Sequence, residues 1–388
     1  MKKTLLLLLF ALAALQLKAL PRFYLLSVAE MNVAYELYGH TAIRVLDDSL
    51  HIDFIVDWGV FDFNQPNFYI NFATGRMLYT TATQEYDDFL RRSHYFKKGV
   101  SSREILLNDA QREHLWKLIR HYLEPQNRDY CYRFIQDNCA TRPRDLLEQT
   151  LGEDVIYPSN PPENRTFRDI LHHYQQPQAW YNLLIDVLLG SRIDKKADFR
   201  AQMFIPEYLE KNLAQTMVRD DTLARPLLGE PVVAVEKIPL HKTPFLLTPE
   251  FIFPLLFLLI FLLDCLKKGQ RLLRIFDICF FGLIIFFGLL ITVLWAFSLH
   301  QEVYDNFNIF WLNPLFVLPL LALRSAKKKL WLLLTASYVV LFGFAASSGI
   351  LPQTFPFTMY VVLLIIVERC YFGWRIKNTE NRTLPNIF

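Results

Sequence analysis

Three side chains in this 388-residue chain could together carry out acyl-group chemistry. Cys139 precedes a run that can form a helix, and His40 and Asp57 lie far upstream of it. A thiolate attacks a carbonyl carbon, an imidazole takes the thiol proton and returns it to the leaving group, and a carboxylate fixes the imidazole tautomer. The combination indicates a hydrolase or a transferase with a cysteine nucleophile.

Two strands are predicted around the histidine and the aspartate. The stretches "HTAIRV" (40–45) and "IDFIVDWGVF" (52–61) are rich in Ile, Val and Phe, and "DDS" between them is typical of a turn. If Asp48 and Ser49 are the central turn residues, His40 lies opposite Asp57 on one face of a hairpin. A slip of one residue would put the two side chains on opposite faces.

A helix is predicted directly after the cysteine. The run "RDLLEQTLG" (144–152) has helical character and ends in Gly152, a typical C-cap. Pro143 is tolerated only in the first turn of a helix, so the helix should begin just after Cys139. A cysteine at a helix start is favoured in its reactive thiolate form.

The amino-terminal residues 1–19 are predicted to be a signal peptide. Lys2 and Lys3 precede an apolar run at 5–15, which is too short for a comfortable membrane span, and Ala19 offers a cleavage site. An uncleaved anchor is the alternative. Either way, residues 20–248 should form an exported domain.

The residues alone leave three classes of protein open. One is a cysteine-dependent transferase, and another is a membrane-tethered cysteine peptidase or amidase that acts on peptidoglycan or another envelope substrate. Cys131 lies close to Cys139 in an oxidising compartment, so a disulfide between them is also possible. That disulfide would make the protein a non-catalytic envelope scaffold.

The carboxyl-terminal third, residues 249–376, is predicted to contain five transmembrane helices. The connecting segments 267–274, 324–329 and 369–377 are basic, whereas 300–306 and 347–357 carry no Lys or Arg. Basic loops stay in the cytoplasm, so this alternation fits an exported amino-terminal domain and a cytoplasmic carboxyl end. The predicted spans are Phe251–Leu266, Phe276–Leu299, Ile309–Leu323, Leu330–Ala346 and Thr358–Val367.

The chain also resembles a known family. "GHTAIRV" followed by "NCATRPRD" is similar to the circularly permuted NlpC/papain-like group, which includes the relatives of lecithin:retinol acyltransferase. More closely, "YELYGHTAIRV", "DWGVFDFNQPNFYINFATGRMLY", "YLEPQNRDYCYRFIQDNCATRPRDLL" and "FNIFWLNPL" resemble the Lnb lipoprotein N-acyltransferases of Bacteroidetes. The resemblance implies an α+β fold: a permuted papain-like, NlpC-like exported domain followed by an all-α bundle of five transmembrane helices.

The resemblance implies an activity as well. The protein would sit in the inner (cytoplasmic) membrane as a multi-pass protein, with its catalytic domain on the periplasmic side. It would move an acyl chain from a membrane phospholipid to the α-amine of a lipoprotein acceptor. Cys139 would form a thioester, with His40 as the base and Asp57 orienting the imidazole. No metal or cofactor and no nucleic-acid partner is expected.

Five further residues are candidates for substrate binding. Arg142 and Arg144 could bind a lipid phosphate or stabilise an oxyanion, although an ordinary salt-bridged arginine is equally consistent. Tyr38 could shape the approach to His40, Glu36 could assist the incoming amine or be a solvated strand-edge residue, and Asn138 adjoins the cysteine.

The segment "FDFNQPNFYINF" (61–72) carries five Phe or Tyr residues. It could form a lipid-facing wall or pack as an aromatic core.

Overall fold

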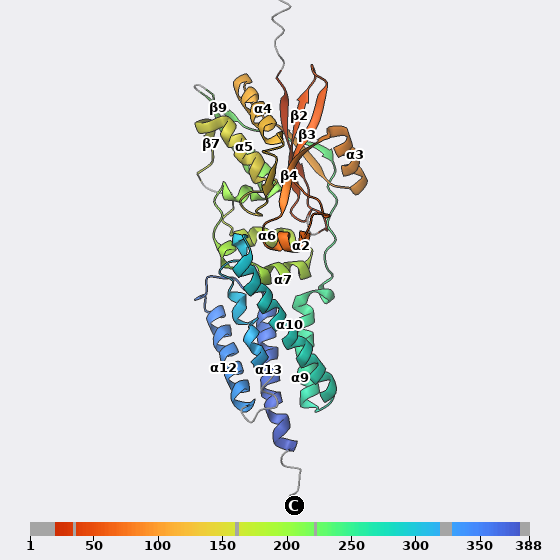
Figure 1. Ribbon diagram of the computed structural model, residues 1–388, viewed down its shortest axis with the longest axis vertical. Helices are drawn as coiled ribbons and strands as arrows, with labels where there is room; N and C mark the ends of the chain where they lie inside the picture. The colour runs from red at the N-terminus through yellow and green to blue at the C-terminus, as the bar shows by residue number, and fades with distance from the viewer. Residues whose placement is uncertain (1–19, 34–35, 160–162, 221–222, 319–327, 381–388) are drawn as a thin grey trace, which may run out of the picture.

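A computed structural model describes most of the chain as a mixed α/β part joined to a bundle of helices (Figure 1). The predicted signal peptide lies outside the described residues. These residues are 20–33, 36–159, 163–220, 223–318 and 328–380.

A seven-stranded sheet forms the frame of the mixed part. Its strand order is β10-β5-β1-β2-β3-β4-β6, and the neighbouring strands pair antiparallel. The strands are β1 (Arg22–Val28), β2 (His40–Asp47), β3 (Ile52–Val60), β4 (Leu78–Glu85), β5 (Val100–Glu104), β6 (Asp129–Cys131) and β10 (Val232–Val235).

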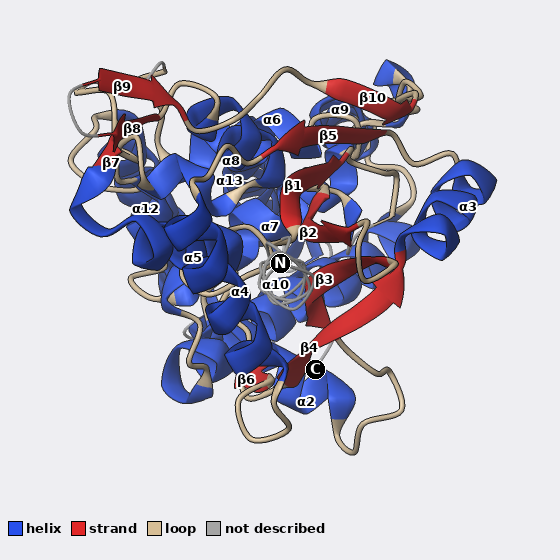
Figure 2. Ribbon diagram, turned by 90° about the horizontal axis from the view of Figure 1, so that it is seen from above, coloured by secondary structure: helices blue, strands red, loops and turns tan. Residues whose placement is uncertain are grey.

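Helices cover both faces of this sheet (Figure 2). On one face, α4 (Asp109–Leu123) and α5 (Thr141–Leu151) pack against alternate strand residues such as Ile43 and Trp58. On the other face, α3 (Tyr86–Phe96) packs against the residues in between, such as Ala42. Because successive side chains of a strand point to opposite faces, the same strands contribute residues to two separate apolar cores.

A layer of short helices lies between the sheet and the helical bundle, and Figure 1 shows α2, α6 and α7 at this level. A small sheet of order β7-β8-β9 stands beside the main one. The helices are α2 (Phe68–Ala73), α6 (Phe167–Gln175), α7 (Ala179–Leu188) and α8 (Pro206–Leu213), with the 3₁₀ helices η2 (Gly152–Asp154), η3 (Ser191–Asp194) and η4 (Ala201–Phe204). The strands are β7 (Val155–Ile156), β8 (Met217–Asp220) and β9 (Leu223–Pro226).

In the part of the chain that the structure describes, four long helices follow at or near the predicted spans. They are α9 (Pro249–Cys265), α10 (Gln270–Phe297), α12 (Lys328–Ser347) and α13 (Phe357–Glu380). Within the described residues, Gln270–Phe297 and Lys329–Ser347 are long and apolar enough to cross a membrane.

The third predicted span, Ile309–Leu323, differs from a continuous helix over its first part. The 3₁₀ helices η7 (Phe307–Phe310) and η8 (Pro314–Phe316) occupy this stretch, and Asn313 accepts a hydrogen bond from the Leu315 backbone N–H between them. The end of the span lies outside the described residues, so the count of five helices stays a prediction.

The hairpin of β2 and β3 forms as predicted, but its register is two residues away from the prediction. Asp57 lies opposite Ala42 rather than His40. The connection is longer than a two-residue turn because Asp47 accepts hydrogen bonds from the backbone N–H groups of Ser49 and Leu50. A slip of two residues preserves the face, so His40 and Asp57 still lie on the same side of the sheet.

Reporter fusions test the orientation of the bundle. Lys268 lies between α9 and α10, and Glu302 lies just beyond the opposite end of α10. A reporter fused after Lys268 should therefore read cytoplasmic and one fused after Glu302 should read exported, because the loop at Lys268 is basic and the loop at Glu302 is not. An exported signal from the Lys268 fusion would contradict this topology.

Candidate functional site

His40 is the first residue of β2, and that end of β2 lies beside the end of β3 that leads down to α2 (Figure 1). The imidazole Nε2 forms a hydrogen bond and ion pair with Asp57 Oδ1 across the hairpin. The contact is diagonal, since Asp57 is opposite Ala42 in the ladder. The structure thus brings two of the three predicted catalytic side chains together at the end of the sheet that faces the bundle.

Cys139 is held by the residue before it. The Asn138 side chain is buried, and its Oδ1 accepts hydrogen bonds from the Ala140 and Thr141 backbone N–H groups, each at 2.8 Å. Its Nδ2 donates to the carbonyls of Phe134 at 2.6 Å and Phe204 at 2.8 Å. Asn138 therefore caps the first turn of α5 and fixes the cysteine loop. Its side-chain amide already makes these hydrogen bonds within the protein.

The helix that follows Cys139 agrees with the sequence prediction. α5 begins at Thr141, Pro143 stands in its first turn, and Gly152 follows its last residue with a positive φ of 58°. The capping bonds start at the residue after the cysteine, so Cys139 lies at the amino-terminal end of the helix.

Gly59 and Tyr132 complete the surroundings of the thiol. Gly59 has a φ of +87°, and a Cβ there would lie 3.4 Å from the Tyr132 ring and 3.8 Å from Cys139 Cβ. A residue with a side chain would be strained at this positive φ, although its Cβ would meet both neighbours at ordinary contact distance. Cys139 is only 8% exposed, and Tyr132 lies beside it, because both residues border the same point of β3 at Gly59.

His40 binds Asp57 and also lies within interaction range of Cys139. Burial lowers the pKa of His40, whereas the charges of Asp57 and Cys139 and hydrogen bonds to both raise it, and the resulting pKa lies well above the usual value for histidine. Because Nε2 is bound to Asp57, Nδ1 is the ring nitrogen left for the thiol. The arrangement places the imidazole between a carboxylate and a thiol.

A cleft of about 340 Å³ opens beside this group on the α3 face of the sheet. It is lined by His40, Asp57 and Phe61, and by side chains of α3 such as Phe89. Glu36 lies in the wall, where its carboxylate is paired with Lys98 Nζ at 2.6 Å. Glu36 and His40 therefore line the same cleft, and a role of Glu36 in substrate binding stays a prediction.

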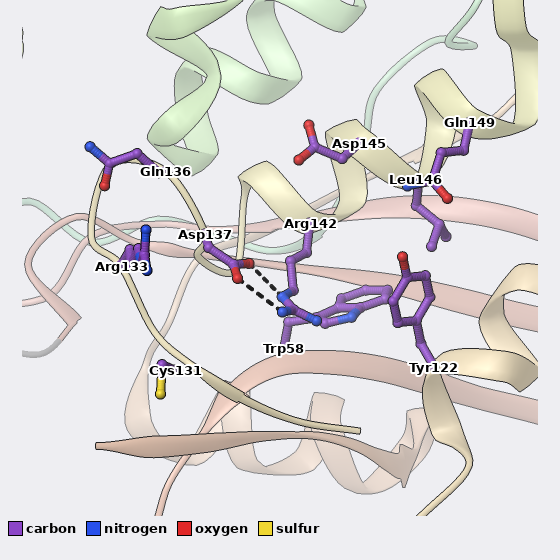
Figure 3. A pocket seen from close by; sticks show the side chains of 10 residues that line it. All are labelled: Trp58, Tyr122, Cys131, Arg133, Gln136, Asp137, Arg142, Asp145, Leu146 and Gln149. Atoms are coloured by element: carbon purple, nitrogen blue, oxygen red, sulfur yellow. Dashed lines mark hydrogen bonds and ion pairs between the residues drawn. The ribbon is translucent and has the colours of Figure 1, made fainter. Parts of the chain in front are cut away.

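A second, larger cleft of about 570 Å³ lies on the α5 side and contains Arg142 (Figure 3). Arg142 binds Asp137 with two hydrogen bonds, at 2.6 and 3.0 Å, and its guanidinium stacks 3.3 Å above the Tyr130 ring. Cys131 and Tyr122 line the same cleft. The Arg142 guanidinium is thus already paired, although it borders open space.

The structure gives Arg144 and Tyr38 contacts within the protein. Arg144 is buried, pairs with Asp145 and donates to the Arg200 carbonyl. The Tyr38 hydroxyl accepts a hydrogen bond from Gln175 at 2.6 Å, and its burial raises the pKa of that hydroxyl. These contacts give both residues structural partners and do not bring them to the His40–Asp57 pair.

The sequence analysis did not single out Tyr132 or Lys98. Tyr132 alternates with Tyr130 across Cys131, a strand-like pattern that could have placed both tyrosines on one face. The salt bridge between Lys98 and Glu36 joins distant segments, and no local sequence pattern predicts it.

Cys131 and Cys139 are both free, so the disulfide alternative is wrong for this structure.

Two family models match the chain. One is described as the Lnb N-terminal periplasmic domain and matches residues 10–172, and the other is described as the Lnb transmembrane domain and matches residues 241–381. Together they define a membrane protein with a periplasmic part, and they cover most of the chain. The chain belongs to the Lnb family. Comparisons with curated proteins and with solved structures found no match.

The His40–Asp57 ion pair should make stability depend on pH. The pKa of folded His40 is raised, so the pair's contribution is complete below the pKa of an unfolded histidine, about 6.5, and is lost as pH rises through the folded pKa. Asp57→Asn should therefore lower the unfolding midpoint more at pH 6 than at pH 10, measured by scanning fluorimetry in detergent. An equal loss at both pH values would contradict the ion pair.

Asn138→Ala should destabilise the fold as well as affect the site. It removes three buried hydrogen bonds and one that is part-buried, including the cap of α5, and should cost at least about 2 kcal/mol of unfolding free energy. Denaturant unfolding measures this, with Asn64→Ala, an exposed asparagine, as the control. Unchanged stability with lost activity would instead favour a direct role in substrate binding.

Proposed function

We propose that this protein is a lipoprotein N-acyltransferase that works through an acyl thioester on Cys139. The observation that carries the proposal is the His40–Asp57 pair at the end of the sheet, with Cys139 beside β3 at Gly59 and within interaction range of His40. A nucleophile, a base and an orienting carboxylate are the groups that such a reaction requires. Membership of the Lnb family supports the choice of lipoprotein and phospholipid as substrates.

The first half-reaction would load the enzyme. The Cys139 thiolate attacks an ester carbonyl of the phospholipid, and the carbon–oxygen bond to the glycerol breaks. The departing alkoxide takes a proton from the His40 imidazolium and leaves as a lysophospholipid. Asp57 keeps the imidazole oriented and stabilises its positive charge before this proton transfer.

The second half-reaction would transfer the acyl group from Cys139 to the acceptor. The neutral α-amine of the lipidated acceptor attacks the thioester carbonyl, His40 accepts the amine proton, and the carbon–sulfur bond breaks. The products are an amide and the original thiolate–imidazolium pair. Glu36 and Lys98 stand in the wall of the His40 cleft and offer charged groups to the acceptor's amino terminus.

Other residues would support the reaction rather than take part in it. Asn138 would hold the thiol at the start of α5, and Gly59 of β3 would supply the positive φ that the strand adopts beside it. Arg142 borders the second cleft, where its unused guanidinium edge could meet a lipid phosphate.

Trapping the acyl-enzyme tests the proposal. With phospholipid and no acceptor, intact-protein mass spectrometry should find Cys139 heavier by one acyl chain. Cys139→Ala and His40→Ala should each abolish both this adduct and acylation of lipoprotein amino termini, and the double variant should lose little more, because the two residues act as one unit.

Cys131→Ala is the matched control, since Cys131 is an exposed free cysteine at the end of β6, eight residues before Cys139. It should retain loading and transfer. Normal lipoprotein acylation by Cys139→Ala would refute the thioester route. Processing of an envelope peptide with no acyl adduct would point instead to the peptidase or amidase.

A further inference from the structure

The short helix α2 is fastened to the outer end of a membrane helix. The last residue of α10 is Phe297, and its carbonyl accepts a hydrogen bond from Arg76 at 2.8 Å. Three more hydrogen bonds join the residues after α10 to the end of α2: Leu299 N–H to the Thr74 carbonyl at 2.9 Å, Ser298 Oγ to the Ala73 carbonyl at 2.9 Å, and His300 Nε2 to the Phe72 carbonyl at 2.9 Å.

This attachment sets the height of α2 relative to a bilayer. α10 has 28 residues. At 1.5 Å per residue it is about 42 Å long, which equals the bilayer with its headgroup layers. A helix pinned to its outer end therefore lies at the level of the outer headgroups. Figure 1 shows α2 at this boundary.

The face of α2 that points away from the protein is apolar. Tyr69 is 82% exposed, Ile70 is 65% exposed, and Phe72 is also exposed. At the same boundary, the turn η5 (Phe245–Leu247) before α9 is exposed as well, and its last carbonyl accepts from Trp180 Nε1. Aromatic and aliphatic groups at this height are typical of the membrane–water interface.

A row of aromatic rings runs from α2 to the thiol. Its members touch in sequence, and the last, Tyr132, lies beside Cys139. The steps are Phe72–Phe68 at 6.3 Å, Phe68–Phe61 at 6.0 Å, Phe61–Tyr79 at 5.3 Å and Tyr79–Tyr132 at 4.4 Å between ring centroids. Phe61 also lines the His40 cleft, so the row borders the cleft as well as the membrane level.

We infer that α2 is the entry point of the acyl donor: its exposed face lies in the outer leaflet, and the ring row guides one phospholipid acyl chain to Cys139. The inference rests on the proposed function and names the route of its first substrate. An acyl chain that leaves the bilayer needs continuous apolar contact, because exposed methylene groups are costly in water. The row supplies that contact from α2 to the thiol.

A matched pair of variants tests the route. Tyr69→Ser with Ile70→Ser removes the apolar face of α2. Tyr95→Ser with Leu223→Ser is the control: Tyr95 is 80% exposed, and its ring contacts Phe96 edge-on at 5.0 Å, as the Tyr69 ring contacts Phe68 at 5.3 Å. Leu223 is 75% exposed, on β9, and α3 and β9 both lie on the mixed part above α2 (Figure 1).

Loading of Cys139 from phospholipid vesicles is the readout. The α2 variant should load about tenfold more slowly than wild type, and the control should load at the wild-type rate. Alkylation of Cys139 by water-soluble iodoacetamide should be equal in all three proteins. Equal loading by the two variants would overturn the inference while leaving the proposed function intact, whereas no loading in wild type would defeat the proposed function itself.

Crosslinking gives an independent measurement on a protein with an unaltered α2. A phospholipid with a diazirine at the end of its acyl chain, bound to Cys139→Ala in nanodiscs, should label residues 61–79. Adducts confined to α9, α10, α12 and α13 would overturn the route. Labelling of 61–79 by a diazirine-bearing lipidated peptide alone would assign the row to the acceptor and overturn it as well.

Discussion

The buried guanidinium of Arg168 holds together the layer that separates the sheet from the membrane helices. Its side chain is 2% exposed and binds Asp194 through two nitrogens, at 2.9 and 3.0 Å, and Asp186 at 2.8 Å. It also donates to the Gly190 carbonyl, and His172 binds the same Asp186 oxygen at 2.7 Å. Removing one partner of such a buried group leaves an uncompensated charge, so α6, α7 and η3 must keep one arrangement.

This layer is joined to both parts of the molecule. On the membrane side, the last carbonyls of α7, which have no partner within the helix, accept hydrogen bonds from the Asn306 and Asn308 side-chain amides. Gly190 lies so close to the loop after α10 that a Cβ would come 2.0 Å from the Tyr304 carbonyl. On the sheet side, Gln175 of α6 donates to Tyr38, two residues before His40. The height of the candidate site above the bundle therefore follows from one buried ionic cluster.

Much of the candidate site could be predicted from local patterns. Alternating apolar residues and turn chemistry predicted β2 and β3, and a proline and a glycine bounded α5. The prediction that His40 and Asp57 share one face was correct although the predicted register was wrong, because a slip of two residues leaves each side chain on the same side of the strand. The length of the turn depended on the Asp47 carboxylate, which can cap several loop conformations, so the pattern did not decide it.

The partners of the polar side chains could not be predicted in the same way. Arg142 and Arg144 flank one proline in the sequence, yet one pairs with Asp137 beside a cleft and the other is buried against the Arg200 carbonyl. Asn138 was predicted at the site because it adjoins the cysteine, but its bond to the Phe204 carbonyl depends on a segment far along the chain. Contacts of this kind are fixed by tertiary packing, which local periodicity does not encode.

The aromatic segment 61–72 is partly an aromatic core, as one of its two sequence interpretations predicted, and a lipid-facing wall stays a prediction. Phe61 and Phe68 pack with Tyr79 and other buried rings, whereas Tyr69 turns outward. One short helix can do both because it offers opposite faces to the protein and to the solvent or lipid.

A fixed height above the membrane bears on the choice between transfer and hydrolysis. An acyl thioester is open to attack by water as well as by an amine, so a transferase must favour the amine through position and exclusion of water. Cys139 is nearly buried beneath Tyr132 and beside Gly59, which limits the approach of solvent. If the proposed function holds, a lipidated acceptor is confined to the same leaflet as the donor, and this confinement raises its effective concentration at the thiol. On the proposed function, the rigid layer around Arg168 favours transfer because it keeps the shielded thiol at the height where both lipids are anchored.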